Sequence, residues 1–299
     1  MFERATSGAK DNFMNEIVYK GFSKHELEYQ YNPRESVPEY PELAKKRAEA
    51  SRKARSTLKS WLNVPYGNSA REILDIYAPD KAGGPVLVYI HGGYWRTGSK
   101  DDNCNFAPTF VQRGAMVVVV EYDLCPKVTV TDIVRQTRAS IAWVYRNIIR
   151  YSGNPSKLYV SGHSAGGHLT AMALAHEWEK EGLPRNLIKG ATATSGVYDL
   201  DVVMRISVNE QVRMTPEIAR ENSPSLHPPL PICPVIIAVG GAEPKGWQQM
   251  SEDYYKLCKQ RGLDCEYLVV PGANHYTMSE HLADAKSPLA QAMFKQMGL

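Results

Sequence analysis

The sequence has no long hydrophobic run and little net charge. No apolar stretch approaches the roughly 18 residues of a membrane-spanning helix, so we expect neither a membrane span nor a membrane partner. The formal net charge at pH 7 is only +3, which argues against a nucleic-acid binder. The first ten residues contain no apolar core, so a secretory signal is not expected there.

Cysteine is also scarce. The five cysteines stand apart at positions 104, 125, 233, 258 and 265. An odd, scattered set favours a reducing compartment over a disulfide framework, and we therefore expect a cytoplasmic protein. None has the spacing of zinc ligands, so neither a metal nor another cofactor is expected. Without internal repeats, the 299 residues fit one α/β domain over 1–299.

Short apolar runs alternate with helical patterns from residue 72 onward. Continuous runs at 85–90 and 115–122 are typical of strands buried in a parallel sheet, whereas 72–77 alternates as a half-buried strand does. This alternation predicts an α/β fold with a mainly parallel sheet and helices on both faces. Further strands are expected at 158–160, 188–195, 235–240 and 265–270, and helices at 102–113, 131–151, 165–177, 248–260 and 282–297.

Two segments depart from this alternation. Residues 1–62 are interpreted as an N-terminal helical extension packed on the domain, with a helix over 41–62. The lysines and arginines of that helix predict a solvated face, in preference to a docking face for an acidic or nucleic-acid partner. Residues 201–234 contain six prolines and are expected to form a lid or pocket wall.

A G-x-S-x-G pattern at 162–166 separates an apolar run from a helical stretch rich in Ala, Leu and Met. In a nucleophile elbow, the serine occupies a strained strand-to-helix turn, and glycines on either side avoid collisions. Ser164 is therefore the expected nucleophile. Its neutral hydroxyl attacks poorly unless a base takes its proton.

The base and the acid should follow other strands, because ligands bind at the carboxyl ends of such a sheet. His275 follows the last expected strand and is favoured over the histidines at 163 and 168, which are tied to the elbow. Glu243 follows the strand at 235–240, and the order Ser164, Glu243, His275 matches α/β-hydrolases. Asp199 also follows a strand and is the alternative acid.

The segment His-Gly-Gly-Tyr-Trp at 91–95 follows the buried strand at 85–90. Glycines there let backbone N–H groups approach a substrate carbonyl closely. Together with the N–H of Ala165, this loop is expected to form an oxyanion hole, in which one donor is typically worth about 3 kcal/mol of barrier.

These motifs, with Ser-Gly-Val-Tyr-Asp-Leu at 195–200 and Gly-Ala-Asn-His at 272–275, resemble the kynurenine formamidase (arylformamidase) family of α/β-hydrolases. Residues 31–38, 64–67 and 74–79 are similar to earlier segments of that family. The resemblance implies Ser164 as nucleophile, His275 as base and the N–H groups of Gly93, Tyr94 and Ala165 as oxyanion donors. The family commonly has an aspartate near position 243, where this chain has glutamate.

We therefore expect a metal-free serine hydrolase of a small aryl formamide, with N-formylkynurenine as the leading candidate. One alternative is a carboxylesterase or amidase for other small aryl esters, amides or carbamates. Another, of a different class, is a ligand-binding protein without turnover. The expected partner is a small-molecule substrate, and a homodimer is left open. Aromatic residues near the expected loop ends would form an apolar slot for the aryl group: Trp95, Tyr198, Trp247 and Tyr276.

Overall fold

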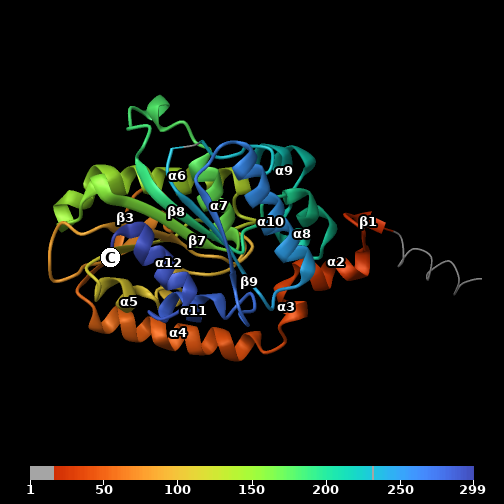
Figure 1. Cartoon of the computed structure of the whole chain (residues 1–299), viewed down its shortest axis with the longest axis horizontal. Helices are drawn as coiled ribbons and strands as arrows, with labels where there is room; N and C mark the ends of the chain where they lie inside the picture. Colours follow the sequence, from red (N-terminus) through yellow and green to blue (C-terminus); the bar gives the residue numbers. More distant parts are fainter. Residues whose placement is uncertain (1–16, 231) are drawn as a thin grey trace, which may run out of the picture.

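A twisted eight-stranded sheet forms the centre of the computed structural model (Figure 1), which describes residues 17–230 and 232–299. The prediction about the first ten residues lies outside this part of the chain. The strand order is β10-β9-β8-β7-β5-β6-β4-β3, and all neighbouring pairs from β6 to β10 are parallel. The strands are β3 Ser60–Pro65, β4 Ile73–Tyr77, β5 Val86–Ile90, β6 Met116–Val120, β7 Leu158–His163, β8 Ile188–Thr194, β9 Val235–Gly240 and β10 Cys265–Val270.

Helices cover both faces of the sheet, as predicted (Figure 1). One face carries α6 Val130–Asn147, α7 Ala165–Leu174 and α10 Lys245–Gln260, and the other carries α4 Tyr40–Thr57, α5 Ala107–Val111, α11 Met278–Ala283 and α12 Pro288–Met297. The remaining elements are β1 Ile17–Tyr19, β2 Phe22–Ser23, α2 Lys24–Tyr31, α3 Pro33–Ser36, α8 Asn209–Val212, α9 Pro216–Asn222 and five 3₁₀ turns: Lys100–Asp102, Ile148–Tyr151, Pro155–Lys157, Trp178–Glu181 and Leu200–Arg205.

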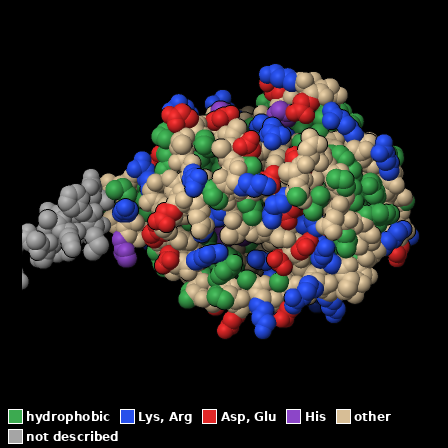
Figure 2. Space-filling view, turned by 180° about the vertical axis from the view of Figure 1, so that it is seen from behind, with side chains coloured by type: hydrophobic (Ala, Val, Ile, Leu, Met, Phe, Trp, Pro, Cys, Tyr) green, Lys and Arg blue, Asp and Glu red, His purple; other side chains and the backbone are tan. Residues whose placement is uncertain are grey.

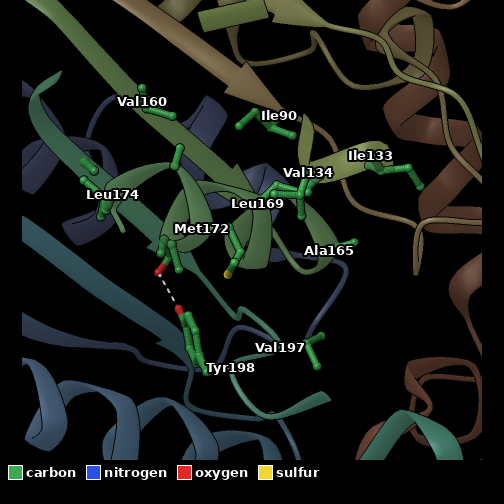
Figure 3. Close-up of a cluster of buried hydrophobic side chains, with 14 of the residues drawn as sticks. Ile90, Ile133, Val134, Val160, Ala165, Leu169, Met172, Leu174, Val197 and Tyr198 are labelled. Carbon is green, nitrogen blue, oxygen red and sulfur yellow. Dashed lines mark hydrogen bonds between the residues drawn. The ribbon is translucent and has the colours of Figure 1, made fainter. Parts of the chain in front are cut away.

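The alternation of side chains along each strand divides the interior into two cores. On β5, Val88 and Ile90 belong to the core under α6 and α7, whereas Leu87 and Tyr89 belong to the core under α5 and α12. Figure 3 shows the first core, where Leu169 of α7 lies among side chains of β5 and α6. Burial on both faces is why these strands are continuously apolar.

The predicted helix over 41–62 is too long. It ends at Thr57, and the chain then forms the edge strand β3, in which Trp61 pairs with Ile76 of β4. Trp61 continues the helical spacing of the apolar residues before it, but Leu58 is already extended, with ψ of 145°. The hydrogen bonds of an open sheet edge outweigh the helical periodicity here. Residues 1–62 are therefore not purely a helical extension, because β3 belongs to the sheet.

Two more predicted helices are interrupted. The stretch 102–113 contains only the end of a 3₁₀ turn and the short helix α5, and 282–297 is divided between α11 and α12. Ser287 begins α12 by accepting a hydrogen bond from the N–H of Ala290 at 3.0 Å, and Pro288 fits the first helical turn. Proline is tolerated in the first turn of a helix but disrupts a helix interior. Pro288 therefore begins α12, and one continuous helix over 282–297 does not form.

The segment before α4 packs against the C-terminal half of the chain. The amide of Gly246, at the start of α10, donates to the side chain of Gln30 at 2.7 Å. Ser207, between β8 and β9, donates its hydroxyl to Glu28 at 2.9 Å. Residues 24–36 and the excursion at 201–234 are thus joined to each other, and the excursion is ordered into short helices over α6 and α2.

Charge is evenly mixed on the face shown in Figure 2, where Lys and Arg side chains are interspersed with Asp and Glu. Among the described residues, no helix combines the length and hydropathy required to cross a bilayer.

Candidate active site

The turn between β7 and α7 holds Ser164 in a strained backbone conformation. Its φ is 57° and its ψ is −118°, and L-residues rarely adopt this combination. A Cβ on Gly162 would lie 2.2 Å from the carbonyl oxygen of Gly166, and one on Gly166 would lie 2.0 Å from that of Ile90. Only glycine therefore fits on either side of the serine. The strand ends at His163 and the helix begins at Ala165, so the serine stands at the carboxyl edge of the sheet.

His275 and Glu243 form a buried pair beyond the ends of β10 and β9. The imidazole Nδ1 lies 2.7 Å from Glu243 Oε2. The other carboxylate oxygen accepts from the Ser195 hydroxyl at 2.5 Å and from the amide of Gly240 at 2.8 Å. Three donors thus hold the carboxylate in one orientation. A carboxylate held in this way keeps the proton of a neutral imidazole on Nδ1 and leaves Nε2 free to accept another.

Aromatic rings enclose the imidazole of His275. Trp247 meets it edge-on, with centroids 4.5 Å apart at 79°, and the indole N–H donates to the carbonyl of Ser195 at 3.0 Å. The ring of His163 lies 4.6 Å from it on another side. Burial lowers the pKa of His163 well below its usual value, and the neighbouring His275 lowers it further. His163 is therefore neutral at pH 7 and adds no positive charge beside His275.

Asp199, the alternative acid, lies elsewhere. Its carboxylate accepts from the phenol of Tyr19 at 2.7 Å and pairs with Lys20 at 3.5 Å. It also accepts from the amide of Asp201 at 3.1 Å, at the start of a 3₁₀ turn. Asp199 therefore anchors the N-terminal hairpin, and the carboxylate that meets His275 is that of Glu243.

The loop after β5 presents backbone amides beside the serine. Gly93, Tyr94 and Trp95 have φ values of 123°, 50° and 55°, which turn the chain sharply. The carbonyl of Gly93 accepts the amides of Arg96 and Thr97, at 3.1 and 3.0 Å. In the described part of the chain, the amides of Gly93 and Tyr94 have no acceptor. Like the amide of Ala165 at the first position of α7, they are available to an oxyanion.

A buried ion-pair network supports this loop from below. Glu121, after β6, accepts from His91 Nε2 at 3.0 Å, from Arg71 at 2.6 Å and from the amide of Lys100 at 3.0 Å. Tyr122 stacks on the His91 ring at 4.3 Å and donates to the His91 carbonyl at 2.7 Å. Residues 91–98, called the oxyanion loop after their predicted donors, are therefore fixed at their start by side chains that follow a neighbouring strand.

We expect Glu121→Gln to lower the free energy of unfolding at pH 7 by about 3 kcal/mol. Burial raises the pKa of Glu121, but His91, the charge of Arg71 and the Lys100 amide outweigh burial and bring the pKa to about 2. A depressed carboxyl pKa stabilises the fold above the ordinary value of 4.5, and this stabilisation is lost as the pH falls toward 2.

Urea unfolding at several pH values checks this prediction. The difference between wild type and Glu121→Gln should be largest at neutral pH and shrink between about pH 4.5 and 2. Glu179→Gln, at an exposed position, is the matched control and should leave the free energy unchanged. If the free energies of unfolding of wild type and Glu121→Gln differed by the same amount at every pH, the ionised carboxylate would not be the stabilising group.

Ser164 and His275 line one cavity of about 380 Å³. The oxyanion loop and residues 102–103 form one part of its wall, and residues 32–34, 40, 44, 45, 47 and 48 of the N-terminal segment form another. Tyr276 lines this cavity as well. The excursion at 201–234 was expected to be a lid or pocket wall, but in the described part of the chain none of its residues lines the cavity.

Three of the four aromatic residues expected in the slot are buried in the core and do not line this cavity in the described part of the chain: Trp95, Tyr198 and Trp247. The indole of Trp95 donates to His168 Nδ1 at 3.2 Å, and Tyr198 stacks on Tyr254 at 4.1 Å. Figure 3 shows Tyr198 beneath α7, where its phenol donates to the carbonyl of Ala193 at 3.3 Å. The structure therefore does not place these three residues in the wall of this cavity. Large aromatic side chains near a strand end are stabilised more by core packing than by lining a wet cavity.

Sequence reasoning missed the contribution of the N-terminal segment to the cavity. Tyr40 packs its ring 4.4 Å from that of Tyr276, and Arg34 lies over the Tyr40 ring at 5.2 Å. The phenol of Tyr94 donates to the carbonyl of Tyr31 at 2.5 Å. The basic face of α4 is not simply solvated, because Arg47 lines the cavity. The available sequence signal is that Arg47 has no acidic residue at i+3 or i+4 of its helix.

Among the described residues, no group of three or more His, Cys, Asp or Glu side chains is arranged to hold a metal ion. The chemistry available to these residues is that of a serine, an imidazole and backbone amides: attack on a carbonyl carbon, proton transfer and stabilisation of an oxyanion.

Known proteins resemble this chain over nearly its whole length. The kynurenine formamidase of Danio rerio is 36% identical over 293 residues, which span 94% of this chain and 98% of that protein. The kynurenine formamidase of Salmo salar is 36% identical over 296 residues, again 94% and 98%. A family model described as BD-FAE matches residues 74–214. The crystal structure of a protein from a Silicibacter species has a TM-score of 0.79 at 25% identity and covers 89% of this chain and 98% of that one.

Proposed function

Because the chain belongs to the kynurenine formamidase family of α/β-hydrolases, we propose that it hydrolyses a small aryl formamide. N-formylkynurenine is the leading candidate, and the products would be formate and the free aryl amine. One observation carries the proposal. Ser164, His275 and the amides of the oxyanion loop face one cavity, in a chain that matches formamidases almost from end to end.

In the proposed first half-reaction, Ser164 Oγ attacks the formyl carbon while His275 Nε2 takes its proton. The amides of Gly93, Tyr94 and Ala165 donate to the oxygen that becomes negative. Glu243 stabilises the imidazolium that forms. The tetrahedral intermediate collapses when His275 protonates the aryl nitrogen, and the free amine leaves behind a formyl ester of the serine.

In the second half-reaction, water replaces the amine. His275 removes a proton from the water, which attacks the formyl ester, and the same amides receive the second oxyanion. Collapse returns the proton to Ser164 and releases formate. A formyl group needs almost no room on the acyl side, so the volume of the cavity is available to the amine half of the substrate.

The test is kcat/KM on N-formylkynurenine beside p-nitrophenyl acetate, with Ser164→Ala as the blank. We expect about 10⁵ M⁻¹s⁻¹ or more on the formamide, well above the ester. Brisk ester cleavage with negligible formamide turnover would contradict the formamidase proposal and favour a carboxylesterase or amidase. Binding of the formamide without turnover of either compound would favour a ligand-binding protein.

A further inference from the structure

The cavity wall supplied by the N-terminal segment and the oxyanion loop is strongly cationic. Arg34, Lys45 and Arg47 line the cavity from residues 32–48, and Arg96 lines it from the loop after β5. Among the described residues of the lining, Asp102 is the only acidic one. The net charge of the whole chain is only +3, so this wall concentrates positive charge well beyond the average.

These arginines are not neutralised by the protein. Within residues 17–230 and 232–299, no acidic side chain forms an ion pair with Arg34, Arg47 or Arg96. Other cations of α4 do have such partners, since Lys46 pairs with Glu280 at 2.9 Å and Arg55 pairs with Asp101 at 2.6 Å. Neither Lys46 nor Arg55 lines the cavity.

Part of the guanidinium surface is buried without a partner. The Nε atoms of Arg47 and Arg96 are shielded from solvent and have no hydrogen-bond acceptor in the described part of the chain. Arg96 Nη1 donates to the neutral side chain of Gln211 in α8, which orients the group without cancelling its charge. Burial lowers the pKa of Arg96, and the charge of Arg34 lowers it further, so the two cations repel each other. A shielded N–H donor without an acceptor is costly unless a ligand supplies that acceptor.

The surroundings hold these groups in place beside an aromatic surface. Arg34 lies over Tyr40, whose ring packs on Tyr276, the residue after His275. Burial and the neighbouring Tyr40 raise the pKa of Tyr276 to about 12, and the positive charges of Arg34 and Arg47 act against this rise. The cavity therefore offers a flat ring surface next to planar donor forks, which suits an aromatic compound that carries a carboxylate.

We propose that Arg34, Arg47 and Arg96 form a carboxylate-binding subsite that makes the enzyme selective for acyl aryl amines with an anionic group on the amine half. This inference rests on the proposed function, because it identifies the substrate class of the same cavity. N-formylkynurenine belongs to this class, since its amino-acid end carries a carboxylate. Formanilide, which shares the formamide and the ring, does not.

The experiment compares matched substrates on Arg34→Met and Arg96→Met. A charge-assisted hydrogen bond contributes enough that each variant should lose about 10- to 100-fold in kcat/KM on N-formylkynurenine. The loss on formanilide should be at least fivefold smaller. Arg52→Met, at an exposed position of α4 away from the cavity, is the control and should match wild type on both compounds. Thermal melting curves establish that each variant is folded.

A second substrate pair keeps the inference testable if formamides are not turned over. Phenyl acetate and its 2-carboxy derivative, acetylsalicylate, differ in the carboxylate alone. If the wild type cleaves these esters but not the formamides, the proposed function is overturned. The subsite still stands in that case if the arginine variants lose more kcat/KM on acetylsalicylate than on phenyl acetate. The subsite is overturned if the variants lose the same factor of kcat/KM on the carboxylated and the uncharged member of each pair, or if neither variant loses any.

Discussion

Replacing Ser164 with alanine is expected to lower kcat on any substrate of this enzyme by about 10⁴-fold or more. The variant keeps Cβ but lacks the oxygen that would form the acyl bond. The strained turn at φ 57° is the same for both residues, so the fold should not change. A fluorophosphonate probe should label the wild type and fail to label the variant.

Ser161 provides the matched control for this result. It lies three residues earlier, on the strand β7 that leads into the turn, and its buried hydroxyl has no hydrogen-bond partner among the described residues. Ser161→Ala should therefore retain turnover and probe labelling. Labelled, active Ser164→Ala protein would exclude Ser164 as the nucleophile and overturn the mechanism while leaving the fold untouched.

Glu243→Gln is expected to lower kcat by about 10³- to 10⁴-fold, with a much smaller change in KM. The amide oxygen of the new glutamine can still accept from Ser195 and Gly240, and its NH₂ group then points toward His275 Nδ1. Nδ1 must then accept a hydrogen bond, so the proton moves to Nε2. An imidazole with its proton on Nε2 cannot take the proton of Ser164.

The exposed Glu266 on β10 supplies a control with the same change of charge. Glu266→Gln should match wild type in both kcat and KM. If Glu243→Gln retained more than a tenth of the wild-type kcat, the carboxylate would not be the group that orients His275.

The centre of the site could be predicted from sequence because short-range rules determine it. The turn at Ser164 requires glycine at two close backbone approaches, and the parallel strands β9 and β10 must end at one edge of the sheet. Glu243 and His275 follow those strands directly. Strand order therefore brings them together, although 31 residues separate them in the chain.

The wall of the cavity could not be predicted in this way. Residues 32–48 meet His275 and Tyr276 only after folding, through contacts such as Tyr40 with Tyr276, and no local pattern specifies such pairs. The direction of a side chain is not specified by such a pattern either. Trp95 and Trp247 do lie next to the site, but each turns its indole inward to a buried acceptor. A position near a strand end determines where the backbone of such a residue lies, but core packing determines the rotamer of its side chain.

The pairing of residues 31–47 with residues 274–280 has a consequence for synthesis on the ribosome. Tyr40 contacts Tyr276, Glu39 accepts from Asn274, and Lys46 pairs with Glu280. The first of these segments leaves the ribosome more than 200 residues before its partners exist. A nascent chain that already contains Ser164 and the oxyanion loop therefore lacks His275 and the partners that fix residues 31–47 beside the cavity, so the complete site cannot assemble before residues 274–280 have been added.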